Sequence, residues 1–283
     1  MNWLSENKKT LSFEVFPPKK EEDFPNVYET LKLLSSLQPD FISVTYGAGG
    51  SKSKKTVDIA SYIQNELHIN AIAHITCVGN KKEAIDDVTN EMIQHNLSCI
   101  LALRGDRPTY MSEEQYLSRD FLHADDMIHY LKKYKDLHIA AACYPEKHYE
   151  ASDYDTDLNF LLQKVNSGVD FLISQLFFDN EIFYRFLDKA RQKGIQVPIL
   201  AGIMPITSSK QLGTTISLSG SSVPKKLSDL IATYGDNPED MKKAGIDYAI
   251  NQIMDLQNNK VDGIHLYSMN KPNTTTQIVN AIR

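Results

Sequence analysis

The chain has 283 residues, of which 42% are hydrophobic and 23% are charged, and its formal net charge is −6. This composition can bury a full core and argues against disorder, while the negative charge argues against nucleic acid or an anionic membrane as the main partner. No apolar stretch approaches the roughly 20 residues that cross a bilayer, and the polar first residues carry no signal-peptide core. We therefore expect a cytoplasmic protein with no membrane partner.

Eight short apolar runs recur along the chain, and each closes on polar residues. We predict strands over 11–16, 41–46, 70–76, 99–105, 138–144, 171–177, 198–204 and 263–269. Helix-period patterning predicts helices over 24–37, 53–66, 81–96, 122–135, 155–167 and 180–193. Eight strands with helical crossovers is the number at which a parallel sheet closes, so we predict an α/β fold, a single (β/α)8 TIM barrel spanning residues 1–283.

Residues 207–262 interrupt the alternation of single strands and helices, and we predict that they form an insertion between the seventh and eighth strands. The segment TTISLSGSSVPKK (214–226) is rich in Ser, Thr and Gly and predicts a loop or flap. The following residues, 228–257, carry the patterning of two helices rather than one. An insertion of this length indicates a functional lid or an oligomer surface.

Three cysteines, Cys77, Cys99 and Cys143, lie in or beside the predicted strands, and no pair has the spacing of metal ligands. Their odd number and apolar surroundings indicate reduced thiols in the core. We predict no metal site.

In a parallel barrel the carboxyl ends of all strands meet at one rim, where such folds carry out chemistry. The polar residues at the predicted strand ends are Glu14, Thr45, His74, Arg104, Asp106, Tyr144, Gln175, Asn270 and Lys271. The loop VTYGAGGS after the second strand adds closely spaced glycines, which admit a ligand near the backbone or simply form a βα turn.

Glu14 stands between Phe13 and Val15 in a run too apolar for a solvated surface. If its side chain points into the barrel mouth, desolvation favours the neutral acid, which makes Glu14 a candidate general acid near neutral pH. The alternative is a Glu on an edge, or one that pairs with a Lys at the surface.

Three further strand ends offer chemistry, and two of them also have a structural explanation. Arg104 and Asp106 place a cation and an anion in one loop, for ligand binding or for a surface salt bridge. His74 is a ligand contact or a satisfied core histidine. Gln175, among Leu and Phe, would be costly to bury without a partner. The sequence shows no set of residues with metal-ligand spacing, no Ser–His–Asp pattern and no candidate Schiff-base lysine at a strand end. These polar groups therefore indicate a bound organic cofactor.

With the motifs SFEVFPP, SVTYGAGGS, AHITCVG, LALRGDRP, AACYPEKH and SQLFFD in this order, the chain resembles the methylenetetrahydrofolate reductase family, in its short bacterial type. The resemblance covers residues 11–206, weakens through 207–262 and returns at LYSMNK. It implies a TIM barrel that binds FAD non-covalently and reduces 5,10-methylenetetrahydrofolate to 5-methyltetrahydrofolate with NADH or NADPH. The family reaction is ping-pong, feeds methionine synthesis and is carried out by homo-oligomers.

The resemblance also assigns roles by motif. The residues that it places against FAD are Thr45, Tyr46, Ala48, His74, Leu103, Arg104, Gly105, Asp106, Ala124, Tyr144, His148, Ala151, Asp157 and Lys164. Glu14 corresponds to the family's acid, which supplies a proton toward folate N10, and Asp106 to the carboxylate that favours the iminium cation. Asp106, Gln175 and Gln211 face the folate.

Two positions depart from the family pattern. Thr215 falls near the place of a large stacking residue, and Lys271 stands where an Arg is usual. Lysine keeps the charge but loses the bidentate fork, so the contact of Lys271 with the folate tail is a weaker expectation. The pyridine nucleotide that the chain prefers cannot be predicted.

Two other functions fit parts of the pattern. A pterin-binding barrel without flavin, such as a methyltransferase, explains Asp106 and Gln175 but gives no role to Tyr144, His148 and Lys164. A non-catalytic subunit that binds through 207–262 leaves Glu14 unexplained.

Overall fold

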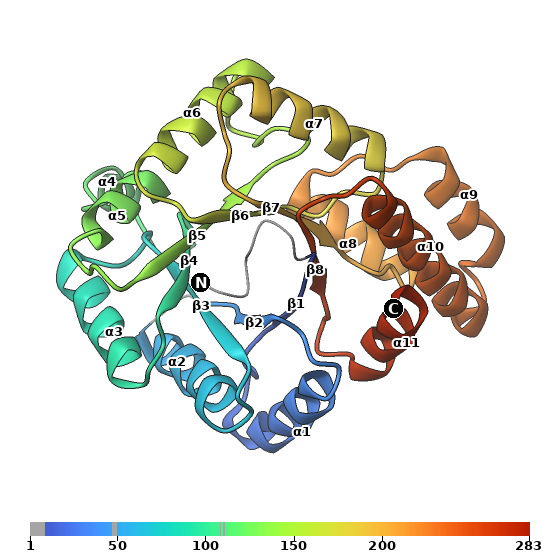
Figure 1. Ribbon diagram of the computed structural model, residues 1–283, viewed down its shortest axis with the longest axis horizontal. Coiled ribbons are helices and arrows are strands. Elements are labelled where there is room, and N and C mark those ends of the chain that lie inside the picture. The colour runs from blue at the N-terminus through green and yellow to red at the C-terminus, as the bar shows by residue number, and fades with distance from the viewer. Residues whose placement is uncertain (1–8, 47–49, 108, 110) are drawn as a thin grey trace.

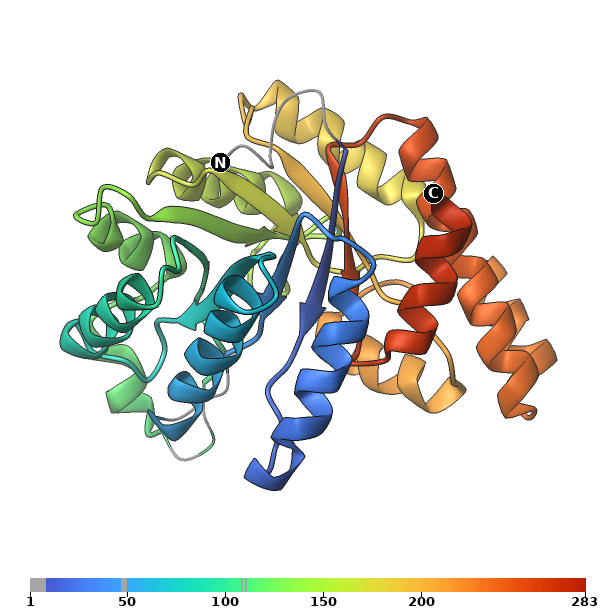
Figure 2. The same ribbon diagram turned by 60° about the horizontal axis from the view of Figure 1, so that its bottom comes forward.

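The computed structural model describes residues 9–46, 50–107, 109 and 111–283. Eight parallel strands form a closed barrel in the order β1 to β8, which confirms the predicted TIM-barrel class (Figure 1). β1 and β8 lie side by side and complete the cylinder (Figure 2). The strands are β1 (Thr10–Val15), β2 (Phe41–Val44), β3 (Asn70–Thr76), β4 (Cys99–Leu103), β5 (His138–Cys143), β6 (Phe171–Ser174), β7 (Ile199–Ile203) and β8 (Gly263–Tyr267).

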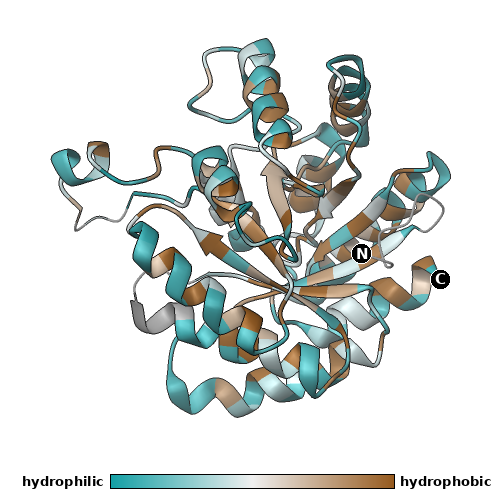
Figure 3. Ribbon diagram, turned by 60° about the vertical axis from the view of Figure 1, so that its left-hand side comes forward, coloured by the Kyte–Doolittle hydropathy of each residue, from teal (hydrophilic) through white to brown (hydrophobic). Residues whose placement is uncertain are grey.

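Helices surround the barrel and follow the strands in the predicted alternation (Figure 1). They are η1 (Glu21–Asp23), α1 (Phe24–Ser35), α2 (Gly50–Asn65), α3 (Lys82–Gln94), α4 (Glu113–Leu117), α5 (Ala124–Leu131), α6 (Tyr154–Asn166), α7 (Asn180–Gln192), α8 (Ser209–Ser219), α9 (Lys225–Tyr234), α10 (Pro238–Asn258) and α11 (Pro272–Ile282). Their apolar residues face the strands, while hydrophilic residues lie outside (Figure 3).

The barrel interior is filled by alternate residues of the strands, which leaves the rim as the place for a ligand. An apolar cluster formed by Phe41, Ile72, Cys99, Leu101, Ala140, Phe171, Ile173 and Leu200 occupies the middle of the cylinder. The intervening residues point outward and pack under the helices. A polar side chain that faces inward near the rim therefore lies next to this apolar cluster.

Several strands end earlier than the sequence predicts, because the polar residues after them leave the sheet to form the rim. The fourth strand, predicted to residue 105, ends at Leu103. Gly105 then has a φ of 81°, and a Cβ at this position would approach Thr76 Cβ to 2.9 Å. Only glycine fits this turn without strain.

The insertion between β7 and β8 differs from the prediction in one part. Residues 214–219, predicted as a loop or flap, lie in α8. Ser208 caps this helix by accepting a hydrogen bond from Gln211 N, and Gly220 ends it with a φ of 69°. Hydroxyl groups within the helix bond to carbonyls one turn back, as Ser217 does with Gly213 O at 2.9 Å. The two helices predicted for 228–257 correspond to α9 and α10.

The three cysteines are free and buried. Burial raises the pKa of Cys77 to about 11 and of Cys143 to about 12, so both side chains are neutral thiols. In the described part of the chain, none of the helices combines the length and apolar character that crossing a membrane requires.

Candidate active site

The carboxyl ends of the strands open onto adjoining cavities. The central cavity, of about 390 Å³, contains Glu14, His74 and Asp106 in its lining. A cavity of about 290 Å³ beside helices α5 and α6, here the α5–α6 cavity, shares Arg104 and Tyr144 with the central one. On the other side the α8 cavity, of about 440 Å³, shares Gln175 with it. Together they form an elongated hollow along the rim.

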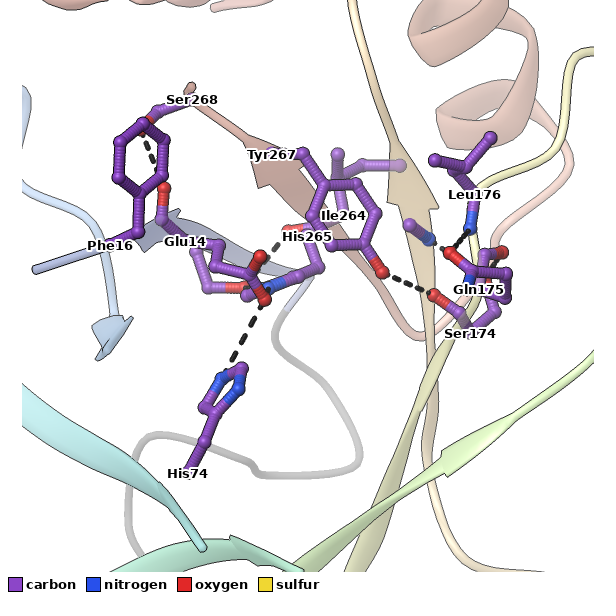
Figure 4. A network of polar contacts seen from close by, with 12 residues as sticks. Glu14, Phe16, His74, Ser174, Gln175, Leu176, Ile264, His265, Tyr267 and Ser268 are labelled. Atoms are coloured by element: carbon purple, nitrogen blue, oxygen red, sulfur yellow. Dashed lines mark hydrogen bonds and ion pairs between the residues drawn. The ribbon is translucent and has the colours of Figure 1, made fainter. Parts of the chain in front are cut away.

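Glu14 projects from β1 into the central cavity, and its side chain is 20% exposed. Its Oε2 atom lies 3.6 Å from His74 Nε2 and 3.7 Å from His265 Nε2 (Figure 4). Neither distance is a hydrogen bond, yet both imidazole nitrogens are buried and have no hydrogen-bond partner in the described structure. The Glu14 carboxyl is therefore the polar group toward which two buried imidazoles are directed.

His74 is not a satisfied core histidine, which was the structural alternative. Desolvation lowers its pKa to about 4, so the ring is neutral at physiological pH. A neutral imidazole beside Glu14 neither fixes the carboxylate by charge nor competes with it for a ligand cation.

Sequence reasoning missed His265 and Tyr267, which face the site from β8. Register places Ser12 beside His265 and Glu14 beside Tyr267, so these side chains share the inner face. The alternation within GIHLY carries this signal, whereas the polar residues that the sequence analysis singles out for this strand end are Asn270 and Lys271. Asn270 instead clamps β1, since its side chain bonds to both the N–H and the C=O of Phe16.

Tyr267 crosses the mouth toward β6. Its hydroxyl donates to Ser174 O at 2.8 Å, and burial raises its pKa well above the ordinary value (Figure 4). A Cβ at Gly202 would lie 2.2 Å from the same Ser174 oxygen, so glycine is required where the ring passes. Next to this contact, the Gln175 side-chain oxygen accepts from Leu176 N at 2.9 Å, which leaves the amide NH₂ to donate to a ligand.

Arg104 does not form its ion pair with Asp106, its expected neighbour in the loop. It binds Glu150 in a bidentate pair, with an Nη2–Oε1 distance of 3.0 Å. This contact raises the pKa of Arg104 and lowers the pKa of Glu150 to about 2. Asp106 is exposed at the central cavity, where its carboxylate can meet a ligand.

The α5–α6 cavity joins aromatic and basic groups. Desolvation raises the pKa of Tyr144 to about 12, and His148 packs edge-on against that ring at 4.7 Å. Asp157 accepts from His148 N at 3.1 Å, and Lys164 Nζ donates to Ala142 O at 2.9 Å. Burial lowers the pKa of both His148 and Lys164.

The structure gathers most of the other predicted site residues in the same hollow. Thr45, Tyr46, Leu103 and Gly105 line the central cavity; Ala124 and Ala151 line the α5–α6 cavity; Gln211 and Thr215 line the α8 cavity. Lys271 is exposed at the start of α11, and its Nζ donates to Thr207 Oγ1 at 3.1 Å. Ala48 lies outside the described residues.

The closed barrel and this polar hollow define a TIM-barrel protein built for a ligand at its strand ends. The profile of the methylenetetrahydrofolate reductase family matches residues 1–283, and the chain belongs to that family. The 5,10-methylenetetrahydrofolate reductase of Escherichia coli (strain K12) is 30% identical over 272 residues, covering 96% of this chain and 90% of that protein. Methylenetetrahydrofolate reductase (NADH) 1 of Arabidopsis thaliana is 34% identical over 270 residues, covering 92% of this chain and 46% of that protein.

The chain thus spans about half the length of the plant relatives that it matches. Among solved structures, a Clostridium thermocellum protein described as binding two copies of 5-methyl-5,6,7,8-tetrahydrofolic acid is similar with a TM-score of 0.68. It is 16% identical and the match covers 99% of this chain and 96% of that one, which supports the fold alone.

Proposed function

We propose that this chain reduces 5,10-methylenetetrahydrofolate to 5-methyltetrahydrofolate with NADH or NADPH, with FAD as its cofactor, by a ping-pong mechanism that feeds methionine synthesis. The observation that carries the proposal is the meeting of Glu14 from β1 and Asp106 from the β4 loop in one cavity. Family membership gives this pair of carboxyl groups its chemical meaning.

The arrangement of the cavities and their donors support FAD as the cofactor. The central and α5–α6 cavities adjoin through Leu103 and Tyr144, which suits an elongated ligand with a ring system at each end. Arg104 and His148 line both cavities and offer donors at their junction. Bound FAD would supply hydride chemistry that amino-acid side chains lack. Thr45 and His74 would contact it in the central cavity, and Asp157 and Lys164 in the α5–α6 cavity.

Glu14 is the proton donor in this proposal. The methylene bridge of the folate must open to a 5-iminium cation, and this opening requires a proton at N10. The carboxyl group stands on an apolar floor beside two imidazoles and close to solvent, which suits a residue that gives up and regains a proton.

Asp106 and Gln175 orient the pterin. An exposed carboxylate at Asp106 accepts hydrogen bonds from the pterin and favours the positive charge that develops on the iminium. The free NH₂ group of Gln175 donates to an acceptor on the pterin edge. Gln211 lines the α8 cavity, where its side-chain oxygen accepts from Thr207 N at 3.0 Å and its NH₂ group donates to Pro205 O at 2.9 Å. One N–H of this amide is then left to donate to the substrate.

The two half-reactions test the proposal separately. The purified chain should show a flavin spectrum, lose it anaerobically with NADH or NADPH, and regain it with 5,10-methylenetetrahydrofolate. Stopped-flow measurement with each nucleotide gives the preference. A colourless protein that binds folate would favour the methyltransferase alternative, and a coloured protein that folate cannot reoxidise would refute the reductase.

A further inference from the structure

The side chain of Glu146 joins two segments of the rim that lie far apart in the sequence. Glu146 belongs to the loop after β5, and both of its carboxylate oxygens accept from Ser222 N, at 3.0 and 3.2 Å. Ser222 follows the end of α8, 76 residues further along the chain. A hydrogen bond to a charged carboxylate is stronger than one between neutral groups, so this contact holds the two segments together.

A second contact holds the same segment to the neighbouring strand end. Ser221 is 5% exposed, and its hydroxyl donates to Leu176 O at 2.9 Å, in the loop after β6. The backbone N–H of Ser221 donates to Ser219 Oγ at 3.2 Å. We call residues 219–222 the α8 terminus. The α8 terminus is thus fastened to the β5 loop through Glu146 and to the β6 loop through Ser221.

The α8 terminus forms part of the wall of the ligand hollow. Ser219 lines both the central cavity and the α8 cavity, and Leu176 lines the α8 cavity. Gln175 and Gln211, which bind folate in the proposed function, line the α8 cavity as well. Glu146 lines none of the three cavities described above. Its effect on a ligand in them therefore passes through the position of the α8 terminus.

The backbone of the β5 loop is strained next to Glu146. Lys147 has a φ of 78°, which is uncommon for a residue with a side chain. Its Nζ donates to His148 O at 3.2 Å and also to Ala151 O, so the side chain of Lys147 stabilises the turn. A strained conformation of this kind persists where the surrounding contacts determine it. The turn separates Glu146, which contacts the α8 terminus, from His148, which lines the α5–α6 cavity.

We propose that Glu146 is a positioning residue for the folate substrate, because it fixes the α8 terminus and with it the wall of the cavity that receives folate. The role toward folate rests on the proposed function, whereas the fastening of α8 does not. FAD binding should not depend on this contact, since Glu146 lies outside the α5–α6 cavity. Loss of the contact removes binding that the ground state and the transition state share, so it should raise KM and leave the limiting rate unchanged.

Glu146→Ala tests this role, and Glu146→Gln is the conservative variant that should rescue it, since an amide oxygen can still accept from Ser222 N. In the FAD-bound full chain, calorimetry gives the Kd for 5-methyltetrahydrofolate, and stopped flow gives the folate half-reaction. We expect Kd and KM to rise about tenfold in Glu146→Ala and by about twofold or less in Glu146→Gln. The limiting rate and the flavin content should stay near wild type. Glu114→Ala is the matched control, because Glu114 is exposed on α4 and lines none of these cavities.

Hydrogen exchange of the full chain, followed by mass spectrometry of peptides that contain Ser222, measures the fastening without any assay. The Ser222 amide should exchange about tenfold faster in Glu146→Ala than in wild type or Glu146→Gln. Equal exchange in wild type and Glu146→Ala overturns the fastening. An unchanged folate Kd and KM in Glu146→Ala overturns the positioning role, as does a limiting rate that falls as much as the affinity. If the wild type fails to turn over folate, the proposed function and the role toward folate fall together, while the exchange result still decides whether Glu146 fastens α8.

Discussion

Glu14 combines a partly buried position with the proposed role of proton donor. Its backbone is fixed, because Ser268 N donates to Glu14 O at 3.3 Å, while its carboxyl reaches the central cavity. We expect Glu14→Gln to leave reduction by NAD(P)H nearly intact and to slow the folate half-reaction by about 10²-fold or more, since an amide cannot deliver a proton. Stopped-flow measurement of both half-reactions checks this, and an equal loss in both would argue against a role specific to folate.

Asp106 differs from Glu14 in that its expected role requires the charged form. Asp106→Asn keeps the size and most hydrogen bonds but removes the negative charge that would favour the iminium cation. We expect the folate half-reaction to slow by about tenfold to a hundredfold, with FAD binding little changed. The measured quantities are the rate of reoxidation by folate and the flavin content of the purified variant. A normal folate rate would remove Asp106 from the mechanism.

His74 makes the stability of the protein depend on pH. Its folded pKa of about 4 lies below that of an unfolded histidine, so the unfolded chain binds the extra proton as the pH falls from about 6.5 to about 4. The free energy of unfolding should therefore decrease across this window, by an amount on the order of 3 kcal/mol. Denaturant unfolding at several pH values measures the slope.

His74→Gln should flatten that slope, because an amide does not titrate. His129→Gln is the matched control, since His129 is exposed on α5 and should leave the slope unchanged. If the free energy of unfolding fell equally steeply with pH in wild type and His74→Gln, groups other than His74 would cause the loss of stability at low pH.

At the scale of elements, α10 packs unusually close to the loop after β7. A Cβ on Gly245 of α10 would lie 1.8 Å from Ile206 O, a backbone atom that cannot move aside cheaply. Gly213 of α8 has no such neighbour within 4 Å. The two glycines therefore sit in helices of the same insertion for different reasons.

Replacing each glycine by alanine separates close packing from helix propensity. Gly245→Ala should destabilise the fold by about 1–3 kcal/mol, through overpacking against the β7 loop. Gly213→Ala should stabilise it by about 0.5–1 kcal/mol, because alanine loses less backbone entropy in a helix. Equilibrium denaturation measures both, and destabilisation of similar size in the two variants would contradict the packing explanation.

The sequence predicted elements well where local pattern decides them. The eight apolar runs correspond to β1–β8, because strands buried on both faces read as continuous apolar stretches. α8 was missed because its Ser and Thr residues resemble a loop in composition. Their hydroxyls bond within the helix, and Leu212 and Thr215 are buried. Composition alone shows neither these hydrogen bonds nor the burial of the two side chains.

At the scale of the whole molecule, the rim was predictable but its pairings were not. Parallel strands bring their carboxyl ends together whatever the loops do, so Glu14 and Asp106 could be expected at one mouth. The pairing of Arg104 with Glu150 joins two different loops, and the contact of His265 with Glu14 depends on barrel closure between β8 and β1. These are tertiary contacts that no local pattern specifies.

The elongated hollow links elements that are distant in sequence, which gives the proposed cofactor a role in stability. Groups lining the α5–α6 cavity come from β4, β5, α5 and α6, and the central cavity adds β1, β3, β6 and β8. A ligand that binds only the folded state stabilises it by about 2.7 kcal/mol at a concentration of 100 Kd. Removal of FAD should therefore lower Tm by several degrees, and added FAD should restore it in a concentration-dependent manner.

Riboflavin separates the two cavities in this measurement. It carries the ring system but lacks the diphosphate and adenosine, so it would leave unfilled the α5–α6 cavity around Asp157 and Lys164. At saturating riboflavin, the recovery of Tm should be clearly smaller than with FAD. Lys164→Met should reduce the recovery with FAD and change that with riboflavin little, because Lys164 lines only the α5–α6 cavity of the two. If riboflavin and FAD restored Tm equally, the contacts of the adenosine half with α5 and α6 would not contribute to the stability of the folded chain.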